Sequence, residues 1–221
     1  MKIEPDILIC ILAFPFVISF LFSLKLLKRI STTTLLKSFV IYTSVALLTY
    51  ILFILMVMKI ISRSDFIKIN ICGVLFNFSY LTFFIFSLIK NKYFKKLIVL
   101  IYIISAFLTI NAIVEQFSTR QILTPNYYIF SLIFFCLLYY FEIFNSIDDD
   151  EILQNACFWI VTGVFVGMGT SLPYQSLASL IFKVIPKNQA YLISSIGTIF
   201  YSVMHLIFIK GFRCSLKIKN I

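Results

Sequence analysis

Long runs of apolar residues, separated by short charged or polar segments, dominate the pattern along this chain. Runs of this length without a charge predict transmembrane α-helices, because about 20 apolar residues in a helix cross the hydrocarbon layer of a bilayer. The pattern predicts seven spans, with boundaries near 7–24, 38–58, 69–89, 97–114, 126–144, 157–182 and 189–209. We therefore expect an all-α integral membrane protein, with residues 1–221 forming one seven-helix transmembrane domain.

The composition leads to the same expectation. Hydrophobic residues make up 61% of the chain and charged residues 13%, whereas soluble domains carry roughly a quarter charged residues. The 19 Lys and Arg outnumber the 9 Asp and Glu, but the basic residues stand at the ends of the apolar runs. There they face anionic lipid headgroups, so we expect a lipid bilayer and no nucleic acid as a partner.

The distribution of Lys and Arg predicts the orientation. If the N-terminus lies outside, segments 25–37, 90–96 and 210–221 lie inside with 4 basic residues each, and 145–156 lies inside with none. The remaining 7 basic residues lie outside. Positive charge concentrates on the cytoplasmic side, which predicts an outer N-terminus and an inner C-terminus. The first run lacks a small-residue cleavage site and is followed by positive charge, so we expect an uncleaved helix.

Polar residues inside three of the spans fall on single helix faces. One face carries Asn70, Gly73, Asn77 and Tyr80; a second carries Gly163, Gly167, Thr170 and Tyr174; a third carries Ser195, Thr198, Ser202 and His205. Gly163 and Gly167 have the small-xxx-small spacing that lets helix backbones approach closely. Such faces either pack helices together or line a pocket, and both interpretations stay open.

The predicted depth of polar side chains in the membrane indicates which residues would line a pocket. The predicted topology places several polar side chains in the outer half of the membrane, near Pro173, which would loosen the helix backbone. The candidate outer polar pocket consists of Asn70, Asn77, Asn111, Glu115, Tyr174 and Gln175.

A run of acids lies in one inner connection. Asp148, Asp149, Asp150 and Glu151 form either a solvated loop or a surface that pairs with basic groups of a partner. Trp159 follows at the predicted inner membrane boundary, where tryptophan commonly anchors a helix. These five residues form the candidate inner partner surface.

Motifs for catalysis or cofactor binding are missing from the sequence. The chain has one histidine, His205, and no HExxH, GxSxG or phosphate-binding loop. We therefore expect no enzyme activity, no metal site and no cofactor, and we interpret His205 as a hydrogen-bonded packing residue. A retinal protein would need a lysine inside the last span, which has none. The five cysteines stand singly, as expected of small buried residues.

Two segments carry a resemblance to a known group of proteins. QNACFWIVTG at 154–163 and ISSIGTIFYSVMHLIFIKGFRC at 193–214 resemble small seven-helix proteins of the Bacteroidota, chiefly through Phe158, Trp159, Ile160 and Gly163. Those proteins look like the membrane-sensing portions of sensor histidine kinases. The resemblance implies a multi-pass protein of a bacterial inner membrane that acts as an input or accessory module. After Lys210 no kinase domain follows, so a signal would pass through another polypeptide.

Three functions therefore stay open. The first is a non-enzymatic, sensor-like or accessory protein that transmits a signal to a partner through its cytoplasmic loops. The second is a small transporter or channel with an outward-facing polar pocket, for which LPYQS at 172–176 is the nearest approach to a PQ-loop motif. The third is a structural subunit of a larger membrane complex, in which the chain could also form a homo-oligomer.

Overall fold

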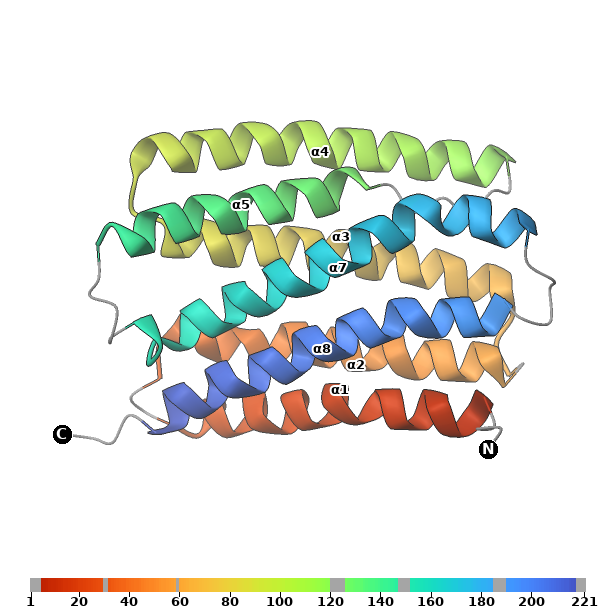
Figure 1. Ribbon diagram of the computed structural model, residues 1–221, viewed down its shortest axis with the longest axis horizontal. Coiled ribbons are helices and arrows are strands. Elements are labelled where there is room, and N and C mark those ends of the chain that lie inside the picture. Colours follow the sequence, from red (N-terminus) through yellow and green to blue (C-terminus); the bar gives the residue numbers. More distant parts are fainter. Residues whose placement is uncertain are drawn as a thin grey trace.

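The described part of the chain is entirely α-helical. The computed structural model describes residues 5–29, 32–58, 60–119, 126–146, 152–184 and 190–217, and Figure 1 shows their helices side by side as one elongated bundle. The helices, with the labels of that figure, are α1 (Pro5–Leu27), α2 (Thr34–Val57), α3 (Arg63–Leu88), α4 (Lys92–Thr119), α5 (Tyr127–Phe144), α7 (Ala156–Val184) and α8 (Ala190–Lys217).

Each apolar run predicted as a span coincides with one of these helices, so the all-α prediction is confirmed. Six helices, α2 to α5, α7 and α8, are long and apolar enough to cross a membrane. In α1, whose side chains are described from Ile11 on, the described apolar stretch is Ile11–Leu27. The architecture is that of a multi-pass helical membrane protein.

Several helices extend beyond the apolar runs because polar side chains cap their ends. The Ser62 hydroxyl accepts a hydrogen bond from the Asp65 amide (3.1 Å), which starts α3 six residues before the predicted span. The Thr33 hydroxyl caps α2, and the side chains of Asn91 and Asn155 accept bonds from the first amides of α4 and α7. Such caps satisfy amides that have no partner within the helix, so the helix can begin in the polar interface.

Consecutive helices in the described part of the chain run in opposite directions, and α8 lies beside α1 and runs parallel to it (Figure 1). The α7–α8 pair makes the most extensive contact, followed by α1 with α8 and α1 with α2. α4 lies at one edge of the bundle and packs mainly on α5. Because α1 and α8 point the same way, both end at the same end of the bundle.

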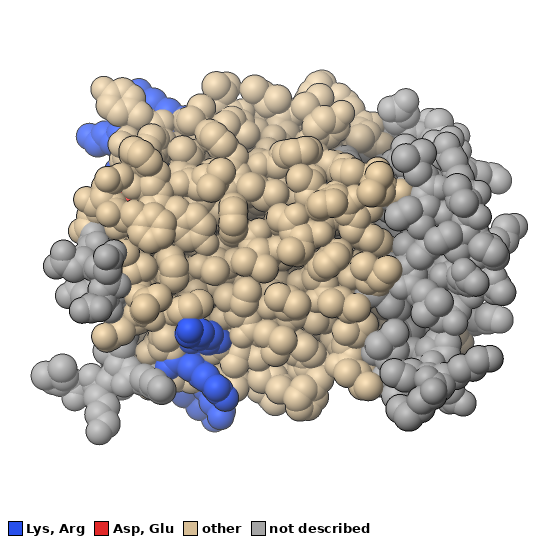
Figure 2. Space-filling model, in the orientation of Figure 1, with Lys and Arg blue, Asp and Glu red and all other residues tan. Residues whose placement is uncertain are grey.

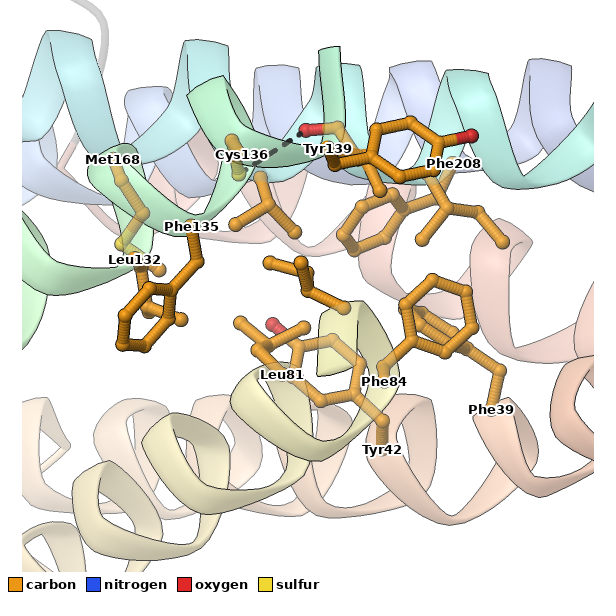
Figure 3. Close-up of a cluster of buried hydrophobic side chains, with 14 of the residues drawn as sticks. Phe39, Tyr42, Leu81, Phe84, Leu132, Phe135, Cys136, Tyr139, Met168 and Phe208 are labelled. Carbon is orange, nitrogen blue, oxygen red and sulfur yellow. Dashed lines mark hydrogen bonds between the residues drawn. The ribbon is translucent and has the colours of Figure 1, made fainter. Parts of the chain in front are cut away.

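The core is formed by large apolar side chains from α2, α3, α5, α7 and α8. Figure 3 shows aromatic rings of Phe39, Tyr42, Phe84 and Phe208 converging near the centre. The Phe39 ring meets those of Phe84 and Phe208 edge to face, at 5.1 and 5.2 Å between centroids. Such edge-to-face pairs are favoured because the positive ring edge meets the negative ring face.

Charged side chains gather at one end of the bundle. All Lys and Arg side chains that the structure describes belong to the ends of α1 and α8, the start of α2 and the α3–α4 connection: Lys25, Lys28, Arg29, Lys37, Lys90, Lys92, Lys95, Lys96, Lys210 and Arg213. We call this end the basic end. Figure 2 shows Lys and Arg side chains towards the left of one face of the molecule, and a broad middle surface on that face without charged residues. A charge-free belt is the surface that lipid tails require.

Candidate functional site

Several polar side chains inside the bundle are joined by hydrogen bonds between helices. Ser23 on α1 bonds Thr43 on α2 (2.7 Å), and Ser38 on α2 bonds the Tyr80 hydroxyl on α3 (2.9 Å). The Tyr140 hydroxyl donates to Thr162 across the α5–α7 contact (3.0 Å). Each bond removes a polar group from lipid and fixes the rotation of one helix against its neighbour.

One such group combines two tyrosines and a glutamine. Gln175 on α7 donates from Nε2 to the Tyr201 hydroxyl on α8 at 3.4 Å. The buried side chain of Tyr128 on α5 lies near both Tyr201 and Gln175. Oε1 of Gln175 is buried and has no hydrogen-bond partner. We call Tyr128, Gln175 and Tyr201 the tyrosine–glutamine cluster.

His205 lies one turn further along α8, towards the basic end. Only 1% of it is exposed, and its Nδ1 lies 2.6 Å from the Ser19 hydroxyl of α1. The Ser19 hydroxyl also lies 3.0 Å from the Phe16 carbonyl, so it either donates to that carbonyl and accepts from Nδ1–H, or donates to Nδ1. Nε2 is buried and has no partner in the described structure.

Aromatic rings surround His205. The ring of Phe16 lies 4.3 Å from the imidazole, and Tyr42 and Phe208 lie at 6.3 and 5.3 Å between centroids. The Tyr42 ring also stacks on Tyr80 at 5.5 Å. Together with the cluster, this arrangement offers two buried polar atoms without a partner, His205 Nε2 and Gln175 Oε1, beside aromatic faces. A buried polar atom without a partner is costly, so a small polar ligand or a water that bonds it would be stabilised there.

The residues of the predicted outer pocket occupy different positions. Gln175 is part of the cluster, and the neighbouring Tyr174 packs on Gly197 of α8, where an added Cβ would lie 2.8 Å from its ring. Asn70 and Asn77 are half-buried on α3, and the Asn77 Oδ1 is buried without a partner. Asn111 is exposed on α4, and the side chain of Glu115 lies outside the described residues.

Sequence reasoning did not select Tyr128, Tyr42 or Ser19 for this site. Tyrosines and serines are numerous in the chain, and no spacing within one helix reveals which of them meet across helices. The one sequence feature that pointed to the α1–α8 contact was the polar face with Ser202 and His205. In the structure this face of α8 contacts α1, where the Ser202 hydroxyl donates to the Leu12 carbonyl at 3.1 Å.

Gly163 and Gly167 lie where α7 meets α8. A Cβ added to Gly163 would lie 2.7 Å from the Phe208 ring, and one added to Gly167 would lie 2.7 Å from the Met204 Cβ. On α8, Gly211 also lies close to α7: a Cβ added to Gly211 would lie 2.9 Å from the Ala156 carbonyl oxygen. Contacts this short require glycine, so α7 and α8 pack as a tight pair over most of their length.

At the basic end, the candidate inner surface is described only in part. The Trp159 indole N–H donates to the Leu153 carbonyl (2.8 Å), and the Lys210 ammonium lies 3.4 Å from the indole ring centroid. Asp148, Asp149, Asp150 and Glu151 lie outside the described residues. Glu142, at the end of α5, accepts bonds from the Lys90 and Asn91 amides at 2.6 and 3.3 Å, so it holds the α3–α4 connection.

No cluster of three or more metal-binding side chains occurs within the described ranges. The cysteines described there are free thiols, and that of Cys136 donates to the Val161 carbonyl at 3.8 Å. No protein-family model, curated protein or solved structure matches the chain.

Proposed function

We propose that this chain is a non-enzymatic, sensor-like or accessory membrane protein that passes a signal to a partner protein at its basic end. In this proposal α1 is the seventh transmembrane helix, because its 23 residues would extend about 35 Å at 1.5 Å per residue, enough to cross a bilayer. The basic end lies inside, since positive charge concentrates on the cytoplasmic side.

The observation that carries the proposal is the course of α8. This helix holds Tyr201 and His205 at the buried polar groups and continues to Lys210 beside Trp159. Between these points the close glycine contacts join α8 to α7. Tightly packed helices move as units rather than deforming, so a ligand that shifts α8 at His205 would also shift the α7–α8 surface at the basic end.

Transport receives less support from the same geometry. A transporter needs a polar path across the membrane midplane. Between His205 and the basic end, the interior holds the Ser23–Thr43 pair and, beside it, the fully buried rings of Phe39, Phe84, Phe208 and Phe212. These rings, which pack on one another, separate the buried polar groups from the basic end in this conformation.

The experiment is site-specific photo-crosslinking in native membranes at endogenous expression. The photoreactive residue replaces Leu153 or Gln154, both exposed at the basic end, and in the control it replaces Phe107, exposed on α4. We expect Leu153 or Gln154 to capture one defined protein that carries a histidine kinase or other signalling domain. The proposal would be rejected if positions 153 and 154 crosslink the same proteins as position 107, or if the captured protein has no signalling domain.

A second arm tests the input site. The Gln175→Leu and Tyr201→Phe variants remove hydrogen bonds of the tyrosine–glutamine cluster, and we expect each to change the adduct yield at Leu153 several-fold. Ser87→Ala, at an exposed serine that bonds only the Phe83 carbonyl of its own helix (2.8 Å), is the control. If the cluster variants match this control, the cluster is not the input site.

A further inference from the structure

The two parallel helices α1 and α8 expose matching stripes of apolar side chains. On α8 the exposed residues Ile196, Ile199, Val203 and Leu206 recur every three or four positions, so they share one helix face. On α1 the exposed residues Ile11, Phe14, Val17 and Leu21 do the same. Both stripes run towards the basic end, and α1 and α8 are in direct contact.

Each stripe ends in exposed cations. The α8 stripe continues in register to Lys210 and Arg213, and the α1 stripe continues to Lys25. The Lys25 ammonium and the Arg213 guanidinium lie against the same ring, that of Phe22, at 5.2 and 5.4 Å from its centroid. Figure 2 shows basic side chains gathered at the lower left, next to charge-free surface over α8.

No described carboxylate neutralises these three cations. Among the acidic side chains that the structure describes, Asp65 belongs to the opposite end of the bundle, at the start of α3, and Glu142 binds the amides of the α3–α4 connection. Lys25 and Arg213 share the Phe22 ring, and Lys210 lies three residues before Arg213 on α8, against the ring of Trp159. Cations gathered at one end of a helix pair repel one another, and an anion bound between them would relieve that repulsion.

We propose that the seam between α1 and α8 binds an anionic phospholipid, with its phosphate held by Lys25, Lys210 and Arg213 and its acyl chains along the two apolar stripes. A lipid fits better than a soluble anion, because the cations stand at the ends of two exposed apolar stripes, which acyl chains would cover. The proposal concerns a lipid site and does not depend on the signalling function.

Fluorescence of Trp159 provides the test, since it is the only tryptophan of the chain and Lys210 lies on its ring. The protein is reconstituted in phosphatidylcholine vesicles that contain an equal mole fraction of either brominated phosphatidylglycerol or brominated phosphatidylcholine. Bromine on an acyl chain quenches tryptophan only at short range. We expect at least twofold stronger quenching by brominated phosphatidylglycerol. Equal quenching by the two lipids would overturn the proposal.

Matched charge variants locate the site. The double variant Lys25→Gln, Arg213→Gln should abolish the preference, that is, the stronger quenching of Trp159 by brominated phosphatidylglycerol than by brominated phosphatidylcholine. It leaves the Lys210–Trp159 contact in place. Lys92→Gln with Lys96→Gln removes the same charge at the start of α4, and it should leave the preference unchanged. If both double variants lose the quenching preference equally, the preference arises from general surface charge, and the assignment of the lipid to this seam is overturned.

Two further outcomes separate the lipid from other anions. Soluble glycerol phosphate at millimolar concentration should not compete, because it lacks acyl chains; full competition would reject the lipid. The triple variant Asp148→Asn, Asp149→Asn, Asp150→Asn should show the same preference as the unmodified protein. If the preference appears only in this variant, the acidic run and not a lipid neutralises the cations, and the proposal fails.

Discussion

The hydrogen bond between Ser19 and His205 joins two helices that are remote in sequence. An imidazole at 1% exposure needs at least one partner, and the Ser19 hydroxyl is the partner that the structure describes. The sequence interpretation of His205 as a hydrogen-bonded packing residue agrees with this position. Its partner could not be predicted, because several serines of other helices were equally eligible and only helix rotation decides among them.

Replacing Ser19 by alanine should destabilise the folded bundle by about 1 kcal/mol, because it leaves the buried Nδ1 of His205 without a hydrogen-bond partner. Reversible unfolding in mixed detergent micelles measures the change. Ser87→Ala, whose hydroxyl is exposed on α3, serves as the control and should change stability by less than about 0.5 kcal/mol. Equal stability of the two variants would show that the Ser19 bond contributes nothing.

At the scale of single helices, hydropathy predicted which segments are helical, and polar caps determined where the helices begin. The helix over the predicted span from 69 begins at Arg63 in the structure, since Ser62 caps a first turn that contains Arg63 and Asp65. Hydropathy cannot detect this extension, because the first turn is polar. The spacing of Gly163 and Gly167 indicated a close helix contact, but it did not show that the neighbour is α8.

Asn155→Ala should destabilise the start of α7 by about 1 kcal/mol, since the Asn155 side chain accepts bonds from the amides of Cys157 and Phe158 at 2.9 and 3.4 Å. Hydrogen exchange at the first turn of α7 reports the change directly. The neighbouring Gln154 is exposed, so Gln154→Ala is the control. If both variants exchange alike, the cap is unimportant.

Gly163→Leu should destabilise the protein by about 1–3 kcal/mol or prevent folding, because its side chain would overlap the Phe208 ring and the Met204 carbonyl. Gly169, on the same helix, has open space where a Cβ would lie. Gly169→Ala is therefore expected to be neutral or slightly stabilising. Thermal unfolding of both variants in detergent tests the pair, and a tolerated leucine at 163 would contradict the described α7–α8 contact.

At the scale of the whole molecule, composition and apolar runs were sufficient to predict a multi-pass helical protein. They were insufficient for the buried polar site, whose members Tyr128, Gln175 and Tyr201 come from three helices. Lipid-facing and core-facing apolar residues have nearly the same composition, so a single sequence does not reveal which helix faces meet. Orientation stays a prediction that rests on the basic residues.

Cysteine labelling tests that orientation. In a variant without the five native cysteines, Ile60→Cys lies in the α2–α3 connection and Lys92→Cys lies at the basic end, and both positions are exposed. With the basic end inside, a membrane-impermeant maleimide added to intact cells should label position 60 and not position 92. Position 92 should react only after the membrane is permeabilised. The reverse pattern would invert the orientation.

The neighbouring position of α1 and α8 has a consequence for the order of assembly during synthesis. Ser23 meets its partner Thr43 only 20 residues later, whereas Ser19 meets His205 after 186. At about 5–20 residues per second, that interval is on the order of ten to forty seconds. During this time the Ser19 hydroxyl can stay bonded to the Phe16 carbonyl of its own helix. The α1–α2 hairpin can thus form first in the bilayer as an assembly intermediate, and α8 packs against α1 last.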